Sequence, residues 1–486
     1  MSVPPATSRD RSSDVAALLP AVVPALVALA SRATALVCGF AMDDAYNIVG
    51  NPALRSLGGA LRSALLPWGA AADDSWTHGL NAAYWRPVTT LFWALQTQLF
   101  GLRPAGWHAV SLLLHAGCAT LLAATMRRLG IAAWPAALAA SWWAAHAVHA
   151  ETVTLSTYQT ELLATLFAFA LLHHAAGERD GGRPARLAVF FALALGSKES
   201  GAAAAVVWAA LAWVRARGED APLAAQLRRF GPGFAALAAV GAVWLGVRST
   251  LVDASALPFF AALDPSQRLA SVGVIVGHEL GWMLLPWPLA PFWDQTMLAP
   301  ALSWATPAAL AGWGSLALLL LVGATQARTR PRVALGALWW IAGLLPTMQF
   351  VPLPVGAAER FVYLASGGVA VLLANALHAS WQTQSGRFRL AAAAVAAWIL
   401  VLGAGSALRA LDFRDDETLH RATVRDHPDG FSGWHYLGTW LLDHGRPAEA
   451  KVALDRAAEI LPDFPPNERL RAAAAKALGS GQAPEP

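Results

Sequence analysis

Residues 15–46 read VAALLPAVVPALVALASRATALVCGFAMDDAY, an apolar run that ends in two adjacent carboxylates. A helix of about 20 apolar residues crosses the hydrocarbon core of a bilayer, so the run predicts a membrane span over 15–38. It lacks the combination of a short apolar core with an A-x-A cleavage site that marks a secretory signal, and we expect a retained anchor. Asp43 and Asp44 follow at the membrane edge, where desolvating a carboxylate is costly. Either a solvated loop begins there or the pair belongs to a functional site.

The composition extends the membrane prediction to the whole chain. Of its 486 residues, 56% are apolar and only 14% are charged, whereas soluble domains contain about 25% charged residues. The formal net charge of +4 comes from Arg-rich loops, and no basic run with interleaved aromatic residues indicates a nucleic-acid partner. Cys38 and Cys118 lie in apolar runs, so we interpret them as small core residues rather than as a disulfide or metal ligands.

The apolar runs predict an all-α, polytopic membrane bundle of about 11 spans. A further run, 271–286, is short and carries His278 and Glu279. Arginine-rich loops favour the cytoplasmic side, and the six such loops can all be cytoplasmic only if 271–286 is re-entrant or interfacial. We therefore expect a cytoplasmic tail over 1–14, a membrane domain over 15–408 and an outer C-terminal segment over 409–486. The predicted spans are 15–38, 107–126, 133–148, 156–176, 186–197, 199–214, 230–250, 304–325, 333–350, 359–378 and 388–408.

With this topology, polar residues from distant parts of the sequence lie at the outer ends of helices. Such groups normally face the bundle interior or a wet cavity. Lys198 is notable because the chain has only three lysines and this one lies between two apolar helices. It either contacts a substrate or forms a Lys–carboxylate pair, with Glu199 or another acid, that only tolerates burial. The residues on the outer side are Asp43, Asp44, Tyr84 to Pro87, His146 to Glu151, Ser197 to Glu199, Glu279, Glu359 and Arg360.

The predicted first outer loop, 41–105, contains an amphipathic pattern. Val88, Leu91, Phe92, Leu95 and Leu99 follow helical spacing, and the opposite face is formed by threonines and glutamines. An interfacial helix on the outer leaflet is the simplest interpretation. We expect a loop of this size to cover a site.

The C-terminal segment matches one tetratricopeptide repeat, with flanking helices near 415–425 and 466–478. A single repeat needs neighbours for stability, so we expect it to pack on these helices or on the membrane domain. The alternative is a tail that only adds solubility. The signature positions are Trp434, Leu437, Gly438, Leu441, Ala450, Leu454, Ala457 and Pro462.

Five blocks, in this order and followed by the repeat, resemble the transmembrane and tetratricopeptide-repeat O-mannosyltransferases. That family belongs to the polyprenyl-phosphate-sugar glycosyltransferases of the GT-C superfamily, and the resemblance covers nearly the whole chain. Two departures stand out: the family usually has many repeats, and Ala147-Val148 replaces a motif with proline between the histidines. The blocks are MDD at 42–44, YWRPVTTL at 84–91, AHAVHAETV at 145–153, SKESG at 197–201 and AERFVYL at 358–364.

The resemblance implies transfer of mannose or another hexose from undecaprenyl- or dolichyl-phosphate to an acceptor hydroxyl, with inversion, at the outer face. Asp43 would be the general base, because an attacking alcohol must lose its proton, and Asp44 would support it. Cations would stabilise the leaving phosphate; the candidates are Lys198, Arg360 and Arg86. The resemblance further implies donor contacts by His146, His149, Glu151, Glu199, Glu359 and Tyr363, with Glu161 and Glu279 of second rank.

Several alternatives remain open at this point. His146, His149 and Glu151 invite a divalent-metal interpretation, although hydrogen bonds to the donor or a purely structural pair fit their spacing better.

The acceptor is expected to be Ser or Thr of an exported protein, with a glycan or lipid hydroxyl as the alternative, and the repeat could hold a protein partner. A transporter would predict inverted repeats, which we do not find, and a membrane-anchored scaffold would leave the charged residues unexplained. The Ala-, Arg- and Gly-rich composition favours a bacterial inner membrane with the site facing the periplasm.

Overall fold

The computed structural model describes residues 11–67, 84–219, 221–252, 263–291, 293–301, 303–350, 353, 355–383 and 386–480. Within these ranges every regular element is a helix, in agreement with the predicted all-α class. Parts of three predicted regions lie outside the described residues: 1–10 of the tail, 68–83 of the first loop and 481–486 of the C-terminal segment.

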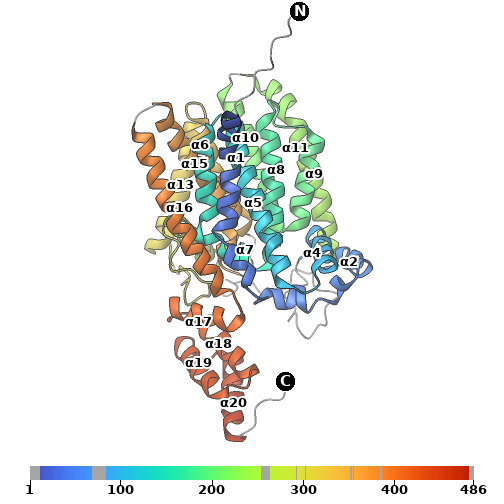
Figure 1. Ribbon diagram of the computed structural model, residues 1–486, viewed down its shortest axis with the longest axis vertical. Helices are drawn as coiled ribbons and strands as arrows, with labels where there is room; N and C mark the ends of the chain where they lie inside the picture. Colours follow the sequence, from blue (N-terminus) through green and yellow to red (C-terminus); the bar gives the residue numbers. More distant parts are fainter. Residues whose placement is uncertain are drawn as a thin grey trace, which may run out of the picture.

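A bundle of long helices forms the upper body of the molecule (Figure 1). Each of the predicted spans overlaps a helix of this bundle. The described helices are α1 (Arg11–Ala30), α5 (Pro104–Arg128), α6 (Ala133–Ala145), α8 (Gln159–Gly177), α9 (Pro184–Ser197), α10 (Ala203–Gly218), α11 (Leu223–Leu251), α13 (Pro307–Gln326), α14 (Pro331–Leu344), α15 (Val362–Gln382) and α16 (Gly386–Asp412).

Seven helical segments in the described part of the chain are long and apolar enough to cross a membrane, which makes this a multi-pass membrane protein. They include α1, α5, α8, α11, α13, α15 and α16. The remaining bundle helices, α6, α9, α10 and α14, have 13 to 16 residues. The predicted count of about 11 spans therefore stays a prediction.

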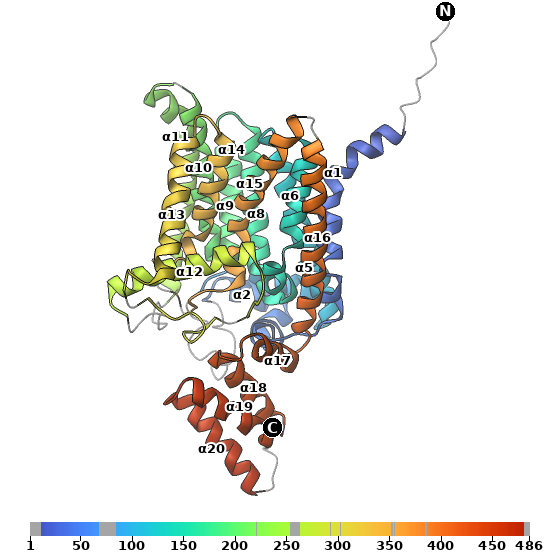
Figure 2. The same ribbon diagram turned by 90° about the vertical axis from the view of Figure 1, so that its left-hand side faces the viewer.

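The run at 271–286 forms α12 (Pro265–Leu284), which begins earlier than predicted because Asp264 caps it. The Asp264 carboxylate accepts hydrogen bonds from the backbone N–H groups of Ser266 and Gln267, at 2.8 and 2.9 Å. Figure 2 shows α12 at the lower end of the bundle, above the C-terminal helices. It is not among the helices that reach the length and hydropathy of a span. A re-entrant or interfacial role remains the prediction for this helix.

The first loop contributes short elements at the same lower end: a π-turn (Ala45–Val49), a 3-10 turn (Pro52–Arg55), α2 (Leu57–Ala64) and α4 (Pro87–Phe100). In α4 the apolar stripe points outward, with Leu95 and Leu99 51% and 65% exposed. The polar face packs inward: Gln96 donates to the Gln159 side chain, and the Thr89 hydroxyl donates to the Ser197 carbonyl at 2.9 Å. This inside-out arrangement fits the predicted interfacial helix, because an outward apolar face suits lipid rather than water.

The C-terminal segment, residues 409–480 as described, continues from α16 into four shorter helices below the bundle (Figures 1 and 2). They are α17 (Asp416–Asp426), α18 (Phe431–Asp443), α19 (Pro447–Ile460) and α20 (Pro465–Ser480). Most of the predicted repeat signature lies in the core of this segment, where Leu437, Leu441 and Leu454 are buried between α18 and α19. The packing matches a helix pair, and the tetratricopeptide assignment remains a prediction.

Candidate active site

The loop after α1 carries the two adjacent carboxylates and presents them differently. Asp43 is half-buried, and its Oδ2 accepts a hydrogen bond from the Tyr158 hydroxyl at 3.0 Å. Asp44 is fully buried and accepts the backbone N–H groups of Ser156 and Thr157, at 3.2 and 2.6 Å. Burial raises the pKa of Asp44 to about 8, and the Thr157 and Ser156 N–H groups oppose that shift. Asp44 therefore ties the loop to the start of α8, whereas Asp43 keeps access to solvent.

Two buried ion pairs lie next to this loop. Arg360 pairs with Glu151 of α7 (Ala150–Thr154), and the Arg360 backbone N–H also donates to Glu151, at 3.0 Å. Lys198 pairs with Glu161 of α8, which also accepts the Ser200 hydroxyl at 3.1 Å. A carboxylate fixes the direction of each cation, because a charged hydrogen bond is stronger and shorter than a neutral one.

Aromatic rings connect the two pairs with each other and with Asp43. The guanidinium of Arg360 lies 4.5 Å from the ring centroid of Tyr158, the residue whose hydroxyl binds Asp43. The Phe361 ring lies 5.3 Å from Arg360 and 5.8 Å from the Lys198 ammonium group. In such cation–π contacts the cation is held against the face of an aromatic ring, which excludes water from that side. We call Asp43, Tyr158, Glu151, Glu161, Lys198 and Arg360 the end cluster.

A third ion pair, more exposed, lies at the edge of the end cluster. Arg86 pairs with Glu199 at 2.9 Å, with side chains 13% and 23% exposed. Its guanidinium also lies 4.4 Å from the Tyr84 ring centroid. The Lys198–Glu199 turn is tight because Gly201 meets the α9 backbone; a Cβ there would stand 2.5 Å from the Ala194 carbonyl. Lys198 pairs with Glu161 rather than with its neighbour Glu199; the sequence had left Glu199 or another acid open as its partner.

The two histidines of the 145–153 block lie elsewhere. Both are fully buried. The His146 Nε2 contacts the Met283 carbonyl at 3.2 Å, and the His149 Nε2 contacts the Ser366 hydroxyl at 3.1 Å. Tyr363 is also fully buried, with its hydroxyl 2.7 Å from the His115 Nδ1. One ring nitrogen of each histidine and the tyrosine hydroxyl therefore bind protein groups inside the bundle, whereas the His149 Nδ1 is buried without a hydrogen-bond partner among the described residues.

Arg32 organises that interior, and the sequence interpretation missed it. It is fully buried and donates to the carbonyls of Ala144 and His146 at the end of α6, the latter at 2.5 Å. It also lies 3.1 Å from the His115 Nε2. A cation at a helix C-terminus satisfies carbonyls that have no partner within the helix. The sequence feature that could have identified Arg32 is that it is the only arginine in the first apolar run, 15–38. We call Arg32, His115, His146, His149 and Tyr363 the inner cluster.

Two other predicted acids are also internal. Glu359 is fully buried, and its Oε1 lies 3.5 Å from the Arg409 Nη2. Glu279 of α12 is fully buried as well. Neither is brought into the end cluster by any ion pair or hydrogen bond of the described residues. In the described part of the chain, no three His, Cys, Asp or Glu side chains are grouped as metal ligands.

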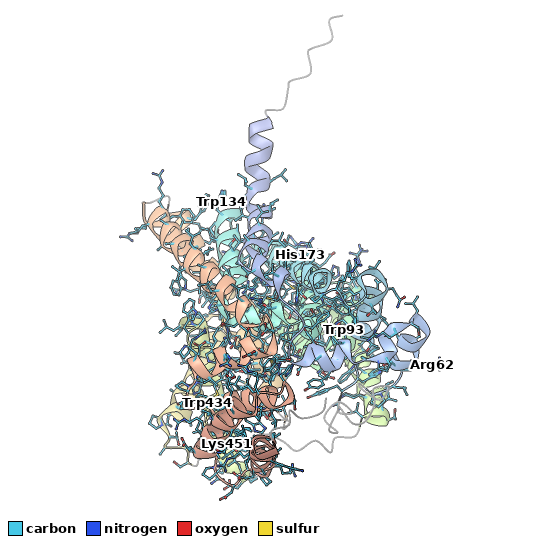
Figure 3. The ribbon with its side chains drawn as sticks, turned by 60° about the horizontal axis from the view of Figure 1, so that its bottom comes forward. Arg62, Trp93, Trp134, His173, Trp434 and Lys451 are labelled. Carbon is cyan, nitrogen blue, oxygen red and sulfur yellow. The ribbon has the colours of Figure 1, made fainter. Side chains whose placement is uncertain are left out.

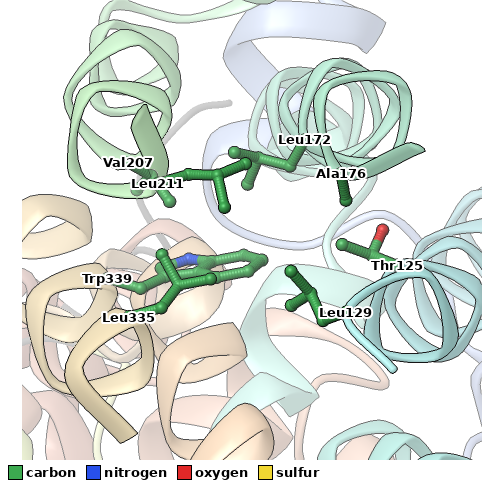
Figure 4. Close-up of a pocket in the computed structure, with 8 residues that line it drawn as sticks. All are labelled: Thr125, Leu129, Leu172, Ala176, Val207, Leu211, Leu335 and Trp339. Carbon is green, nitrogen blue, oxygen red and sulfur yellow. The ribbon is translucent and has the colours of Figure 1, made fainter. Parts of the chain in front are cut away.

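Figure 3 turns the end that carries Asp43 toward the viewer. The helices of the first loop, with Arg62 and Trp93, lie on one side of the view, and the C-terminal helices, with Trp434 and Lys451, lie on the other. A separate apolar pocket lies between α5, α8, α10 and α14, near the opposite end of α5 (Figure 4). It is lined by aliphatic and aromatic side chains such as Leu172, Leu335 and Trp339 and contains none of the predicted site residues.

Comparison with known proteins agrees with the resemblance seen in the sequence blocks. Human protein O-mannosyl-transferase TMTC4 is 25% identical over 467 residues, which cover 85% of this chain and 62% of that protein. Human TMTC1 is 30% identical over 168 residues, covering 32% of this chain and 18% of that protein. Drosophila melanogaster Tmtc2 is 34% identical over 87 residues, covering 18% and 9%.

No family model and no solved structure matches the chain. The alignment with human TMTC4 spans less than two thirds of that relative's length. Along most of its own length, this multi-pass membrane protein is similar to proteins named as protein O-mannosyl-transferases of the TMTC group.

Proposed function

We propose that the protein is an integral-membrane inverting glycosyltransferase that moves a hexose from a polyprenyl phosphate to an acceptor hydroxyl. The observation that carries the proposal is the end cluster itself. A solvent-accessible carboxylate, Asp43, shares a tyrosine with Arg360 at one end of an apolar bundle, and Lys198 stands close by. A lipid-linked phosphosugar needs this combination, because its tail lies in the membrane and its reacting atoms lie at the edge.

In the proposed reaction, Asp43 takes the proton of the acceptor hydroxyl while the acceptor oxygen forms a bond to the anomeric carbon. The bond from that carbon to the phosphate oxygen breaks, and the polyprenyl phosphate leaves with the electron pair. Attack opposite to the leaving group inverts the anomeric configuration. The hydrogen bond from Tyr158 orients the Asp43 carboxylate, and the buried Asp44 fixes the loop beneath it.

Negative charge develops on the leaving phosphate, and three cations are close enough to one another to receive it. Lys198, Arg360 and Arg86 are each held by a carboxylate, so they are oriented before the donor binds. Fixed cations in a site shielded from water stabilise developing charge most effectively, because they need no reorganisation during the reaction. Arg360 could bind two phosphate oxygens at once, whereas lysine acts as a point charge.

The finer assignments follow the sequence resemblance. We propose mannose or another hexose on undecaprenyl- or dolichyl-phosphate as the donor and Ser or Thr of an exported protein as the acceptor, with a glycan or lipid hydroxyl as the alternative. The site would face the periplasm from a bacterial inner membrane. We assign Glu151 and Glu199 to orienting the cations. We assign His146, His149 and Tyr363 to the scaffold, because each has a ring nitrogen or hydroxyl in contact with a protein group, and Glu359 as well, because its carboxylate lies 3.5 Å from Arg409.

The test is transfer from radiolabelled polyprenyl-phosphate mannose to Ser/Thr peptides by the full chain in proteoliposomes. We expect Asp43→Asn to lower turnover by about 10²–10⁴-fold, the usual contribution of a general base, with donor binding retained. Asp429→Asn is the matched control, since Asp429 is an exposed acid of the C-terminal segment. Turnover of the Asp43 variant at the wild-type rate would refute the proposed base, and a wild-type protein that transfers no polyprenyl-linked sugar would refute the activity.

A further inference from the structure

The C-terminal segment is hydrogen-bonded to the loop that carries Asp43. The Met42 backbone N–H donates to the Oδ1 of Asp416 at 2.7 Å, and the Gly39 N–H donates to the Arg414 carbonyl at 2.8 Å. These contacts join residues that lie 374 or more positions apart in sequence. They bracket the short stretch of chain immediately before Asp43.

The backbone of this stretch is in a conformation that needs outside support. Met42 has a φ of +51°, in the left-handed region that residues with a Cβ rarely adopt. Such a conformation persists only where the surroundings determine it, and it is frequent at functional sites. The carboxylate of Asp416 supplies a charged acceptor for the Met42 N–H in this conformation.

Packing gives a second, independent link between the same elements. The buried Met42 side chain belongs to a small apolar cluster of its own, separate from the main core of the bundle. Phe413 and Leu419 join this cluster from the C-terminal segment, and Leu155 and Tyr158 join it from the turn between α7 and α8. Tyr158 is the partner of Asp43. The C-terminal segment is therefore hydrogen-bonded to the loop that carries the proposed base and shares an apolar cluster with the residue that orients the base.

A third contact fixes the segment on the membrane domain from another side. Asp294, in the loop after α12, accepts the Ser432 N–H at 2.7 Å, and the Thr296 hydroxyl accepts the Phe431 N–H at 3.0 Å. These bonds satisfy donors at the start of α18, which has no side-chain cap of its own. The position of the segment relative to Asp43 is thus determined at two separate places.

We infer that Asp416 is a positioning residue of the transfer reaction and that the C-terminal segment is a structural part of the active site. Asp416 holds the left-handed turn at Met42 and thereby the direction in which Asp43 meets the acceptor hydroxyl. This inference rests on the proposed role of Asp43 as the base. It gives the C-terminal segment a function in turnover that does not depend on binding a separate protein.

The experiment compares three single variants of the full chain in the same transfer assay. Asp416→Ala removes the acceptor, and we expect kcat to fall roughly 10- to 100-fold, as for a catalytic group displaced by about 1 Å. The donor KM stays unchanged, because Lys198 and Arg360 are untouched. Asp416→Asn keeps an acceptor oxygen and should retain most of the kcat. Asp415→Ala is the matched control: it removes the cap of α17, where Asp415 accepts the Thr418 N–H at 2.8 Å, and leaves the Met42 bond in place.

A double-mutant cycle separates positioning from simple structural damage. If Asp416 acts through Asp43, Asp416→Ala costs nothing further in an Asp43→Asn background, whereas independent effects add. Additive losses, or an Asp415→Ala variant that is equally impaired while equally folded by size exclusion and thermal unfolding, would overturn the inference. The proposed function fails separately, if the wild-type protein transfers no polyprenyl-linked sugar. The role of Asp43 as the base fails if Asp43→Asn is fully active, whereas only the positioning role fails if Asp43→Asn is inactive and Asp416→Ala keeps the wild-type kcat.

Discussion

The end cluster and the inner cluster are both built from buried polar residues, yet they differ in how those residues are used. In the inner cluster, Arg32 and the histidines contact carbonyls, hydroxyls and one another with no exposed surface. In the end cluster, Lys198 and Arg360 are paired with carboxylates, while some surface stays accessible at Asp43. Polar residues at membrane depth are therefore not sufficient to indicate a reaction site. A ligand must also be able to reach them.

One sequence block contributes to both clusters. Within 145–153, His146 and His149 face the inner cluster, whereas Glu151 holds Arg360 in the end cluster. The division arises because α6 ends at Ala145, where Arg32 takes the last carbonyls, and a short turn redirects the chain before α7. A motif read as one unit in sequence thus serves two structural purposes.

The largest expected effect comes from breaking the Arg360–Glu151 pair. Arg360→Met removes a phosphate cation, which we expect to lower turnover by about 10²–10³-fold. It also leaves Glu151 buried without its partner, which should reduce the free energy of unfolding by about 3–5 kcal/mol. Thermal unfolding in detergent and the transfer assay measure the two effects separately.

The double variant Arg360→Met with Glu151→Gln removes both charges of that pair. It should regain much of the stability and none of the activity. If the double variant regained transfer, Arg360 would be a structural residue, and the distinction between the two clusters would fail.

In the inner cluster we expect a smaller loss of stability and little loss of turnover. Arg32→Met leaves the Ala144 and His146 carbonyls without their donor, which should lower stability by about 2–3 kcal/mol. Turnover per folded molecule should change far less than the about 10²–10⁴-fold cost of losing a catalytic acid or base. His149→Gln provides a second test in the same cluster. A hundredfold loss of turnover in either variant, at full folding, would place the inner cluster in the reaction site.

The effect that is smallest at neutral pH concerns a buried histidine outside the membrane-spanning helices, His420 of α17. Burial lowers the pKa of His420 to about 4, so the folded state favours the neutral ring. Between pH 6.5 and pH 4 the unfolded state binds more protons, and stability falls as the pH drops through this window. The loss should reach about 3 kcal/mol near pH 4. Hydrogen exchange of the C-terminal segment at several pH values measures this loss of stability. The variant His420→Gln should make the stability depend less steeply on pH. If the pH dependence were unchanged in this variant, groups other than His420 would cause it.

Much of the architecture could be predicted because it depends on local pattern. The apolar runs located the bundle helices, and apolar residues at helical spacing along 88–99 located α4. The gathering of Lys198, Arg360 and Arg86 at the Asp43 end followed from topology and from the order of the sequence blocks. The sequence interpretation gave Asp43 and Asp44 different roles, and those roles stay proposals; in the structure one carboxylate keeps solvent access and the other is buried on backbone donors.

The pairing of side chains could not be predicted in the same way. Lys198 could have paired with the adjacent Glu199, yet it pairs with Glu161, 37 residues away. Glu199 in turn binds Arg86 across 113 residues. From the sequence, Asp416 is predicted only to lie at the start of a polar helix. Its hydrogen bond to Met42 depends on how the C-terminal segment packs under the bundle.

The sequence by itself determined that this is a helical multi-pass membrane protein, which residues carry charge at helix ends, and which proteins it is similar to. Those properties follow from hydropathy over about 20 residues and from local motifs. Only the tertiary structure decided which charges are paired, which polar groups are enclosed and which carboxylate stays accessible. The physical reason is that desolvation and ion pairing depend on atoms from separate helices, and a one-dimensional pattern does not contain those distances.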